Sequence, residues 1–256
     1  MFEVWMQERS KIEHLFAEHD NARAILFQLM RLGLGYVRVD SQANPNVAWF
    51  HYHPINFLAG IAHSEESHLL VDRIPYLNII IVPTEDWNSL VKEKYGDELR
   101  IQKRTRFSPD SLDLTEIRHL KQKIPAEVDL QRINRDNLRT VYPAVRRTID
   151  LHFGSINGLL KQGVGFCAVY GKRIVSLAYS AFPFIDEFEV QVDTVDDPSY
   201  RRRGLATAVS ATLIEYALEN DMVPHWDASN LASIRLAEKL GYSDPISWEA
   251  YYRKKS

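Results

Sequence analysis

Several features that would assign the chain to a specialised class are missing. One cysteine in 256 residues, Cys167, cannot close an internal disulfide or build a thiolate zinc site. The 31 lysines and arginines are balanced by 34 aspartates and glutamates, so the net charge of −3 gives no general attraction for nucleic acid or anionic membranes. The most apolar stretch, residues 77–83, is too short to span a bilayer, and residues 1–8 lack the basic start of a signal peptide. We therefore expect a cytoplasmic protein with no nucleic-acid or membrane partner and no metal.

What is present describes an ordinary globular protein with a sizeable core, because hydrophobic residues make up 45% of the chain. A length of 256 residues suits one large domain or two of about 130 residues each. The composition shifts between residues 105 and 126, where a Ser-Pro-Asp-Ser sequence and a basic run precede Pro125. We place a domain boundary there, which gives an N-terminal domain of residues 1–125 and a C-terminal domain of residues 126–256.

The N-terminal half has the pattern of a smaller α/β domain. Apolar residues at every third or fourth position predict an amphipathic helix over residues 6–34. Short apolar runs between turn residues predict strands over residues 36–39, 48–51, 56–59, 68–72 and 78–82. Thr84, followed by two acidic residues, predicts the start of a helix that Gly96 ends. This half has no chemical signature, since His51 and His53 have no third ligand at metal spacing.

The C-terminal half predicts a mixed α/β layout. A strand over residues 128–133 and helical segments within residues 135–162 come first. A hairpin of residues 165–170 and 173–181, turned by Gly171 and Lys172, leads to a strand over residues 188–195. A helix over residues 204–220, a strand over 223–227 and a helix over 231–240 complete the pattern.

The chemical signature lies where strand 188–195 passes through a loop into the helix that starts at Gly204. A glycine at such a junction lets backbone amides approach an anion, and the helix N-terminus adds unpaired N–H groups and a partial positive charge. Three consecutive arginines, Arg201, Arg202 and Arg203, add local attraction for phosphate. The arrangement predicts a diphosphate site. No second basic cluster accompanies the triplet, which argues against a nucleic-acid surface.

Two motifs in this half resemble the signatures of one family. The R-x-x-G-x-A sequence of residues 201–206 matches the Q/R-x-x-G-x-G/A acetyl-CoA signature of the GNAT N-acetyltransferase superfamily. The segment from Trp226 to Tyr242, with Asn230 ahead of a helix that ends in Lys-Leu-Gly-Tyr, is similar to that family's other C-terminal signature. The likeness covers residues 127–242. It resembles in particular a bacterial GNAT branch with an extra N-terminal domain.

The resemblance implies a fold and a way of holding acetyl-CoA, as a co-substrate. Strands 188–195 and 223–227 would splay apart, so that the pantetheine arm binds the backbone of Thr194 and Val195 like an added strand. Asn230 and Ser233 would line the thioester end. The residues implied for the diphosphate are Arg201, Arg202, Arg203, Gly204, Leu205, Ala206 and Thr207.

The resemblance also implies direct attack by a neutral amine on the thioester, which needs a base for the amine proton. Glu189 stands where glutamate-using members of the superfamily have their base. Strand alternation places Asp193, our second candidate, on the same face. His225 or Asp227 on the neighbouring strand could act through water.

The leaving thiolate needs an acid, and here the sequence departs from the family pattern. Many members have a tyrosine in the last helix, and the matching position is Ala237, which cannot donate a proton. Tyr242, Ser233 and Tyr200 remain as candidates. Otherwise the thiolate leaves with help from water and backbone alone.

Two functions are consistent with these residues. The first is an N-acetyltransferase that moves an acetyl group from acetyl-CoA to a primary amine of a small molecule, such as a metabolite, an amino acid or an antibiotic-like amine. The second is a catalytically weak acyl-CoA-binding regulatory module. Phe182, Phe184 and the acidic residues 186–187 suit a cationic amine with apolar parts. Residues 1–125 are left with two candidate roles, covering the site and forming the contact of a homodimer.

Overall fold

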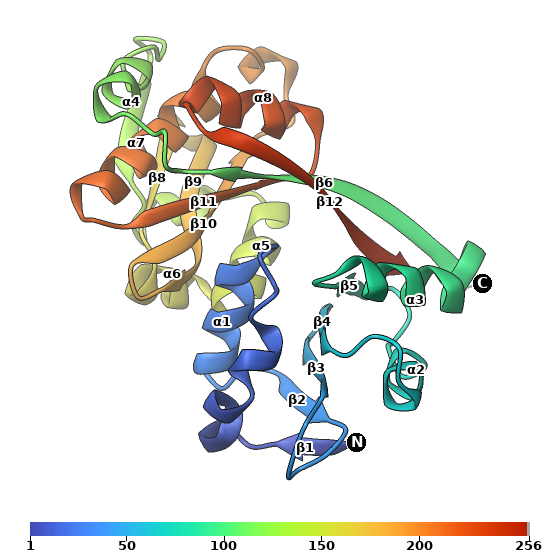
Figure 1. Cartoon of the computed structure of the whole chain (residues 1–256). Coiled ribbons are helices and arrows are strands. Elements are labelled where there is room, and N and C mark those ends of the chain that lie inside the picture. The colour runs from blue at the N-terminus through green and yellow to red at the C-terminus, as the bar shows by residue number, and fades with distance from the viewer. Residues whose placement is uncertain (255–256) are drawn as a thin grey trace. The chain divides into compact units, whose positions relative to one another are not determined.

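The computed structural model describes residues 1–254 and divides into two compact units (Figure 1). Unit 1 comprises Met1–Arg104 and the residues from Ser247 onward, and unit 2 comprises Thr105–Ile246. This division differs from the boundary predicted after residue 125. Residues 105–125 fall in unit 2 because helix α4 (Leu114–Lys121) packs on helix α7 (Leu205–Glu219). The residues from Ser247 fall in unit 1 because strand β12 (Ser243–Arg253) pairs with β5 (Ile79–Ile81).

Unit 1 combines a mixed sheet with short helices. The strands lie in the order β1-β2-β3-β4-β5-β12, in which β4 and β5 are parallel and the other neighbours antiparallel. Its buried core contains Trp49, Leu58, Trp87, Leu90 and Tyr251. The further elements are β1 (Phe2–Val4), η1 (Met6–Lys11), η2 (Glu13–Phe16), α1 (Arg23–Arg31), β2 (Tyr36–Val39), β3 (Val47–Tyr52), β4 (Ile55–Gly60), α2 (Glu65–Val71), α3 (Glu85–Tyr95) and η3 (Gly96–Glu98).

The single helix predicted over residues 6–34 is wrong. Two short 3₁₀ helices, η1 and η2, take up its first half, and α1 begins only at Arg23, after Ala22 with a φ of 55°. A 3₁₀ helix buries every third residue, so its apolar spacing resembles that of an α-helix over a short stretch.

The buried side chain of Arg9 joins η1 to the end of α1. Its guanidinium donates hydrogen bonds to the carbonyl oxygens of Met30, Leu34 and Gly35 at 3.3, 2.7 and 2.7 Å. These carbonyls lie at and beyond the C-terminal turn of α1, where intrahelical donors are lacking. Arg9 therefore acts as a cap supplied from elsewhere in the chain.

The strand predicted over residues 68–72 is also wrong, because helix α2 occupies this segment. Ser64 caps the helix by accepting a hydrogen bond from the N–H of Ser67, and two glutamates occupy the first turn. A serine followed by two glutamates is an N-cap pattern. The short apolar run after it was interpreted as a strand instead. The other four strands predicted in this half and the helix capped by Thr84 are confirmed.

Unit 2 contains the strands β6-β11-β10-β9-β8-β7 in that order, of which β10 and β11 run parallel. The predicted hairpin is confirmed as β8 and β9. Strands β6 and β12 were not predicted, because charged residues and Pro245 interrupt their apolar alternation. The remaining elements are β6 (Leu99–Ser108), β7 (Val128–Arg132), η4 (Asn137–Thr140), α5 (Pro143–Phe153), α6 (Ile156–Gln162), β8 (Gly165–Tyr170), β9 (Arg173–Phe184), β10 (Glu187–Thr194), η5 (Pro198–Tyr200), β11 (Val223–Ala228) and α8 (Leu231–Leu240).

The two faces of the unit 2 sheet differ in chemistry. Helix α7 packs across β8, β9 and β10, with α4 beside it (Figure 1). Val190 and Val192 of β10 belong to the core under α7. Alternation turns Glu189, Gln191 and Asp193 to the opposite face, on the side of α5. The mixed α/β class predicted from the sequence is confirmed.

No helix in the described part of the chain is long and apolar enough to cross a membrane.

Candidate functional site

Strands β10 and β11 run side by side for only part of their length. They pair in parallel from Glu187 with Val223 to Glu189 with His225. The next three residues of β11 pair with β6 on the other edge of the strand, while β10 continues along β9 as far as Thr194. The strands therefore part after Glu189 and His225, which confirms the predicted splay.

The backbone of β10 beyond this point presents hydrogen-bonding groups to the side that β11 has left. Val195 donates its N–H to the carbonyl of Val175 at 3.0 Å, and its own carbonyl accepts from the N–H of Asp197 at 2.8 Å. Both groups of Val195 are thus used within the chain. Because successive strand residues direct their backbone groups to opposite sides, those of Thr194 and Val192 point away from β9. An extended ligand can pair there as an added strand.

The loop after β10 and the first turn of α7 form a cradle of backbone N–H groups. Arg202 and Gly204 have φ values of 57° and 78°. Left-handed residues next to ordinary ones turn successive N–H groups toward a common point, which is an anion-binding arrangement. The first intrahelical bond of α7 runs from Ala208 N–H to Gly204 O, so the N–H groups of residues 205–207 precede it. These donors and the helix dipole fit a diphosphate.

Gly204 is required at this position for two reasons. Its positive φ is costly for residues with a side chain. In addition, an added Cβ would lie 2.8 Å from the carbonyl oxygen of Lys123, which precedes β7. The chain segment after α4 therefore lies directly against the cradle.

Two of the three arginines are engaged by carboxylates. Arg201 forms an ion pair with Asp196, and Arg203 forms one with Glu127. Exposed pairs of this kind contribute little to stability, because solvent and salt screen them. The guanidinium groups are therefore held beside the loop by contacts that an incoming phosphate can replace.

The predicted base Glu189 lies half-buried at the last paired row before the strands part. Burial raises the pKa of the Tyr242 phenol, and the negative charge of Glu189 adds to that shift. Opposite it in the ladder, His225 makes a hydrogen bond of 2.9 Å through Nε2 to the carboxylate of Glu187. Ionisable groups from both strands thus gather at the point of separation.

The second candidate, Asp193, accepts a hydrogen bond of 2.8 Å from the hydroxyl of Tyr142. Burial raises the pKa of the Asp193 carboxyl, and the Tyr142 bond opposes that shift. Nearby, the hydroxyl of Tyr179 lies 3.1 Å from Nδ1 of His152, whose pKa burial lowers to about 4. Asp193 lies four positions beyond Glu189, which is about 13 Å along a strand. The two carboxylates therefore do not meet at one reacting atom.

Tyr242 is buried, and its hydroxyl donates a hydrogen bond of 2.8 Å to the carbonyl of Pro224. The hydrogen that the sequence assigned to acid catalysis is therefore engaged in a structural bond. Ala237 is also fully buried, in the core between α7 and α8. Tyr200 lies in η5, just ahead of the arginines, with its ring 6.0 Å from that of Tyr170.

Asn230 and Ser233 occupy the first turn of α8. The side-chain oxygen of Asn230 caps the helix by accepting from the N–H of Ser233 at 3.0 Å. The Oγ atom of Ser233 in turn accepts a hydrogen bond of 3.2 Å from the indole N–H of Trp226. Trp226 is the first β11 residue beyond the rows paired with β10. The hydrogen bond between Trp226 and Ser233 therefore joins the first turn of α8 to the point where β10 and β11 part.

Sequence reasoning missed three residues that contact the predicted site. Lys123 and Glu127 belong to a segment that precedes the family signatures, and their contacts to Gly204 and Arg203 join residues far apart in the chain. Tyr142 was also missed. The Pro143 that follows it marks the first turn of α5, but nothing local connects the tyrosine with Asp193.

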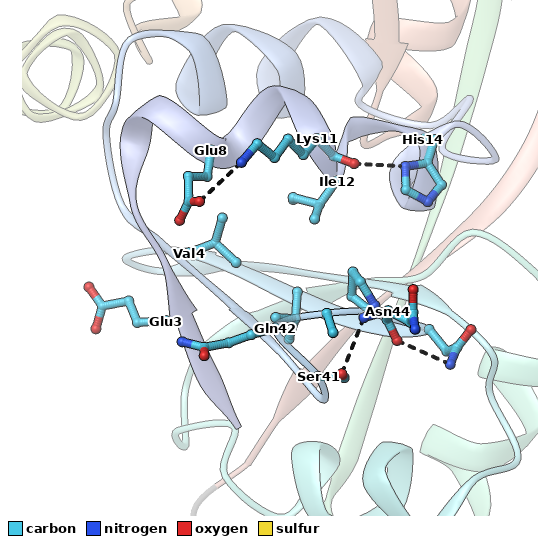
Figure 2. A pocket seen from close by; sticks show the side chains of 13 residues that line it. Glu3, Val4, Glu8, Lys11, Ile12, His14, Ser41, Gln42 and Asn44 are labelled. Carbon is cyan, nitrogen blue, oxygen red and sulfur yellow. Dashed lines mark hydrogen bonds and ion pairs between the residues drawn. The ribbon is translucent and has the colours of Figure 1, made fainter.

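A hollow of about 640 Å³ in unit 1 lies between η1 and the loop after β2 (Figure 2). Figure 2 shows its polar side chains bonded locally: Glu8 pairs with Lys11 at 3.2 Å, and Nδ1 of His14 lies 3.0 Å from the Lys11 carbonyl. None of the predicted site residues lines it. Among the described residues, no group of three or more His, Cys, Asp or Glu side chains is placed to hold a metal ion.

Comparison with known sequences extends beyond the motif region. The sequence model of the GNAT acetyltransferase family matches residues 13–251, which include most of unit 1. The chain is 29% identical over 173 residues to a Bacillus subtilis (strain 168) protein named as the uncharacterised N-acetyltransferase YdfB. That match covers 66% of this chain and 63% of the relative, so it spans less than two thirds of the relative's length.

Solved structures show the same fold. A GCN5-related N-acetyltransferase-like protein from Streptococcus suis 89/1591 superposes with a TM-score of 0.80 at 27% identity, covering 97% of this chain and 99% of that one. An acetyltransferase of the GNAT family from Colwellia psychrerythraea superposes with a TM-score of 0.62 at 10% identity, covering 99% of each chain. The likeness includes both units.

Proposed function

Because the chain belongs to the GNAT acetyltransferase family, we propose that it transfers the acetyl group of acetyl-CoA directly to the primary amine of a small molecule. The observation that carries this proposal is the parting of β10 and β11 after Glu189 and His225. Beyond this point the backbone groups of Val192 and Thr194 point away from β9, on the stretch of β10 that leads to the cradle at Gly204. This strand edge suits a pantetheine arm, and the cradle suits a diphosphate.

Acetyl-CoA, when bound, supplies an activated acyl carbon that an amine takes up while the C–S bond breaks. Glu189 is our candidate for the base that removes the amine proton, because it lies where the strands part. Asp193 lies about 13 Å further along the strand, and its carboxylate is engaged by Tyr142. We assign Asp193 to the wall of the acceptor side, where a carboxylate favours a cationic amine.

The alternative is a catalytically weak acyl-CoA-binding module. The buried Ala237 favours it, because this position offers no hydroxyl to the leaving thiolate. The cradle and the edge of β10 beyond Glu189 serve both functions equally. What separates them is turnover.

The deciding experiment measures release of free CoA thiol from acetyl-CoA across a panel of small primary amines, with the acetylated product identified by mass spectrometry. An acetyltransferase gives product with at least one amine, and Glu189→Gln loses most of that rate. Saturable binding of CoA in calorimetry, without acetyl transfer to any amine of the panel, would establish the binding module instead. Absence of CoA binding contradicts both.

A further inference from the structure

The carboxylate of Asp193 is half-buried without a positive partner. It accepts the 2.8 Å hydrogen bond from the hydroxyl of Tyr142 and a further bond from the backbone of Thr194. No lysine or arginine in the described part of the chain forms an ion pair with it. Taking a carboxylate out of water is costly unless a positive charge compensates it. The structure therefore leaves a negative charge here that a cationic ligand would neutralise.

The side chains around Asp193 bring no positive charge of their own. Tyr179 pairs with Gln191 in the β9–β10 ladder, so it stands on the same face of the sheet as Asp193. Nδ1 of His152 lies 3.1 Å from the Tyr179 hydroxyl, and the His152 ring lies 4.5 Å from that of Phe182. Burial lowers the pKa of His152 to about 4, so this imidazole is neutral at pH 7. Aromatic and neutral neighbours exclude water, which strengthens the attraction between Asp193 and a cation.

Asp193 shares its face of β10 with the proposed base. Glu189 lies four positions earlier on the same side of the strand, about 13 Å away. Gln191 stands between them and is uncharged. All three side chains are partly exposed, so a ligand can reach the whole row. The row thus has a carboxylate at each end, one where β10 and β11 part and one further along the strand.

We propose that the acceptor is a linear diamine, of which one amine reacts beside Glu189 while the ammonium at the other end pairs with Asp193. This inference rests on the proposed acetyl transfer and names the class of its acceptor. The reacting nitrogen bonds to the acetyl carbon as the C–S bond breaks. Its proton passes to Glu189, and the electron pair of the C–S bond leaves with sulfur.

The separation of the two carboxylates sets the length of the diamine. An extended carbon chain advances about 1.2 Å per bond, since three bonds of peptide backbone span about 3.6 Å. A hydrogen bond at either carboxylate shortens the required distance between the nitrogens to about 8–13 Å. This distance corresponds to about six to ten methylene groups. A monoamine that reacts beside Glu189 leaves Asp193 without a partner.

The test compares diamines, monoamines and ω-amino acids of equal chain length, from the three-carbon to the ten-carbon members. At each length, the ratio of kcat/KM for the diamine to that for the monoamine removes the contribution of the apolar chain. We expect this ratio to be within about threefold of one for the short members and about 10 to 100 for the long ones, as for a hydrogen-bonded ion pair. The long ω-amino acids should be poorer acceptors than the monoamines, because their carboxylate meets that of Asp193.

Asp193→Asn keeps an acceptor for the Tyr142 hydroxyl but removes the charge. The ratio should then fall to within about threefold of one at every length, and the discrimination against ω-amino acids should disappear. Asp129→Asn, an equal change on exposed β7, should keep the wild-type ratio. Mass spectrometry should find a single acetyl group on the diamine, because the neutral amide of the product no longer pairs with Asp193.

A wild type that acetylates diamines and monoamines equally well at every length overturns the inference while the proposed function stands. An Asp193→Asn variant that keeps the wild-type ratio overturns it as well. If this variant does not fold, the three wild-type series decide by themselves. No transfer to any amine of the panel refutes the proposed acetyl transfer itself.

Discussion

The carbonyl oxygen of Lys123 stands 2.8 Å from the place that a Cβ atom would take on Gly204. Gly204→Ala must therefore displace the segment before β7 or shift the start of α7, and it also meets the cost of a positive φ. Either shift moves the N–H groups of the cradle. We expect the dissociation constant for CoA, measured by calorimetry, to rise at least about tenfold, a change of about 1.4 kcal/mol.

Gly171→Ala is the matched control for this change. Gly171 has a φ of 63° in the β8–β9 turn, and an added Cβ meets nothing within 4 Å. Both variants share the backbone cost, but only the one at Gly204 crowds the cradle. Equal CoA affinity in the two variants would contradict the placement of the diphosphate.

Glu189→Gln removes the proposed base while keeping the size of the side chain. We expect kcat to fall about 10²- to 10⁴-fold with little change in CoA affinity. The remaining rate should keep rising with pH, because the amine must then lose its proton to solvent. Asp129→Asn, an equivalent change on exposed β7, should keep the wild-type rate. A pH profile of Glu189→Gln that matches the wild type in shape and height excludes this role.

Asp193→Asn tests whether the buried negative charge of Asp193 lowers the stability of the folded protein. The native pKa of Asp193 is raised by burial, so the folded state holds this proton more tightly than the unfolded chain. The contribution of Asp193 to stability therefore falls as pH rises through its raised pKa. The amide oxygen of asparagine still accepts from Tyr142 but bears no charge. We expect the variant to melt at or above the wild-type temperature at pH 7, with the difference shrinking toward pH 4. The prediction is wrong if the melting temperature of the variant, relative to that of the wild type, is lower at pH 7 than at pH 4.

Arg9→Ala should destabilise the protein by about 3 kcal/mol in chemical denaturation, because it leaves the carbonyls of Met30, Leu34 and Gly35 without their donor. Lys11→Ala, in the same 3₁₀ helix, removes only an exposed pair with Glu8 and should cost less than about 1 kcal/mol. Similar losses in the two variants would show that Arg9 is not the cap of α1.

The sequence was most informative where local chemistry decides the structure. The start of α7 after Gly204 and the hairpin turn at Gly171 both depend on glycines with positive φ, which a single chain position reveals. The order of strands and helices from β7 to α8 followed from apolar spacing and from the two family motifs. Such signals do not depend on which distant segment packs against them.

Contacts between distant segments could not be predicted in this way. The Ser233–Trp226 bond joins a helix to a strand, and the Tyr142–Asp193 bond joins residues that 51 positions separate. Nothing in the sequence near Tyr242 shows that its hydroxyl donates to Pro224, so the sequence kept it among the candidate acids. In the helix predicted over residues 6–34, apolar spacing alone did not distinguish 3₁₀ turns from an α-helix.

The strand β12 gives the two units a fixed order of completion during synthesis. Tyr251 and Tyr252 pair with Ile80 and Ile79 of β5, so unit 1 needs residues that leave the ribosome after all of unit 2. Unit 2 is one continuous segment and can fold while β5 still lacks this partner. The half of the protein that is translated first is thus the last to be finished.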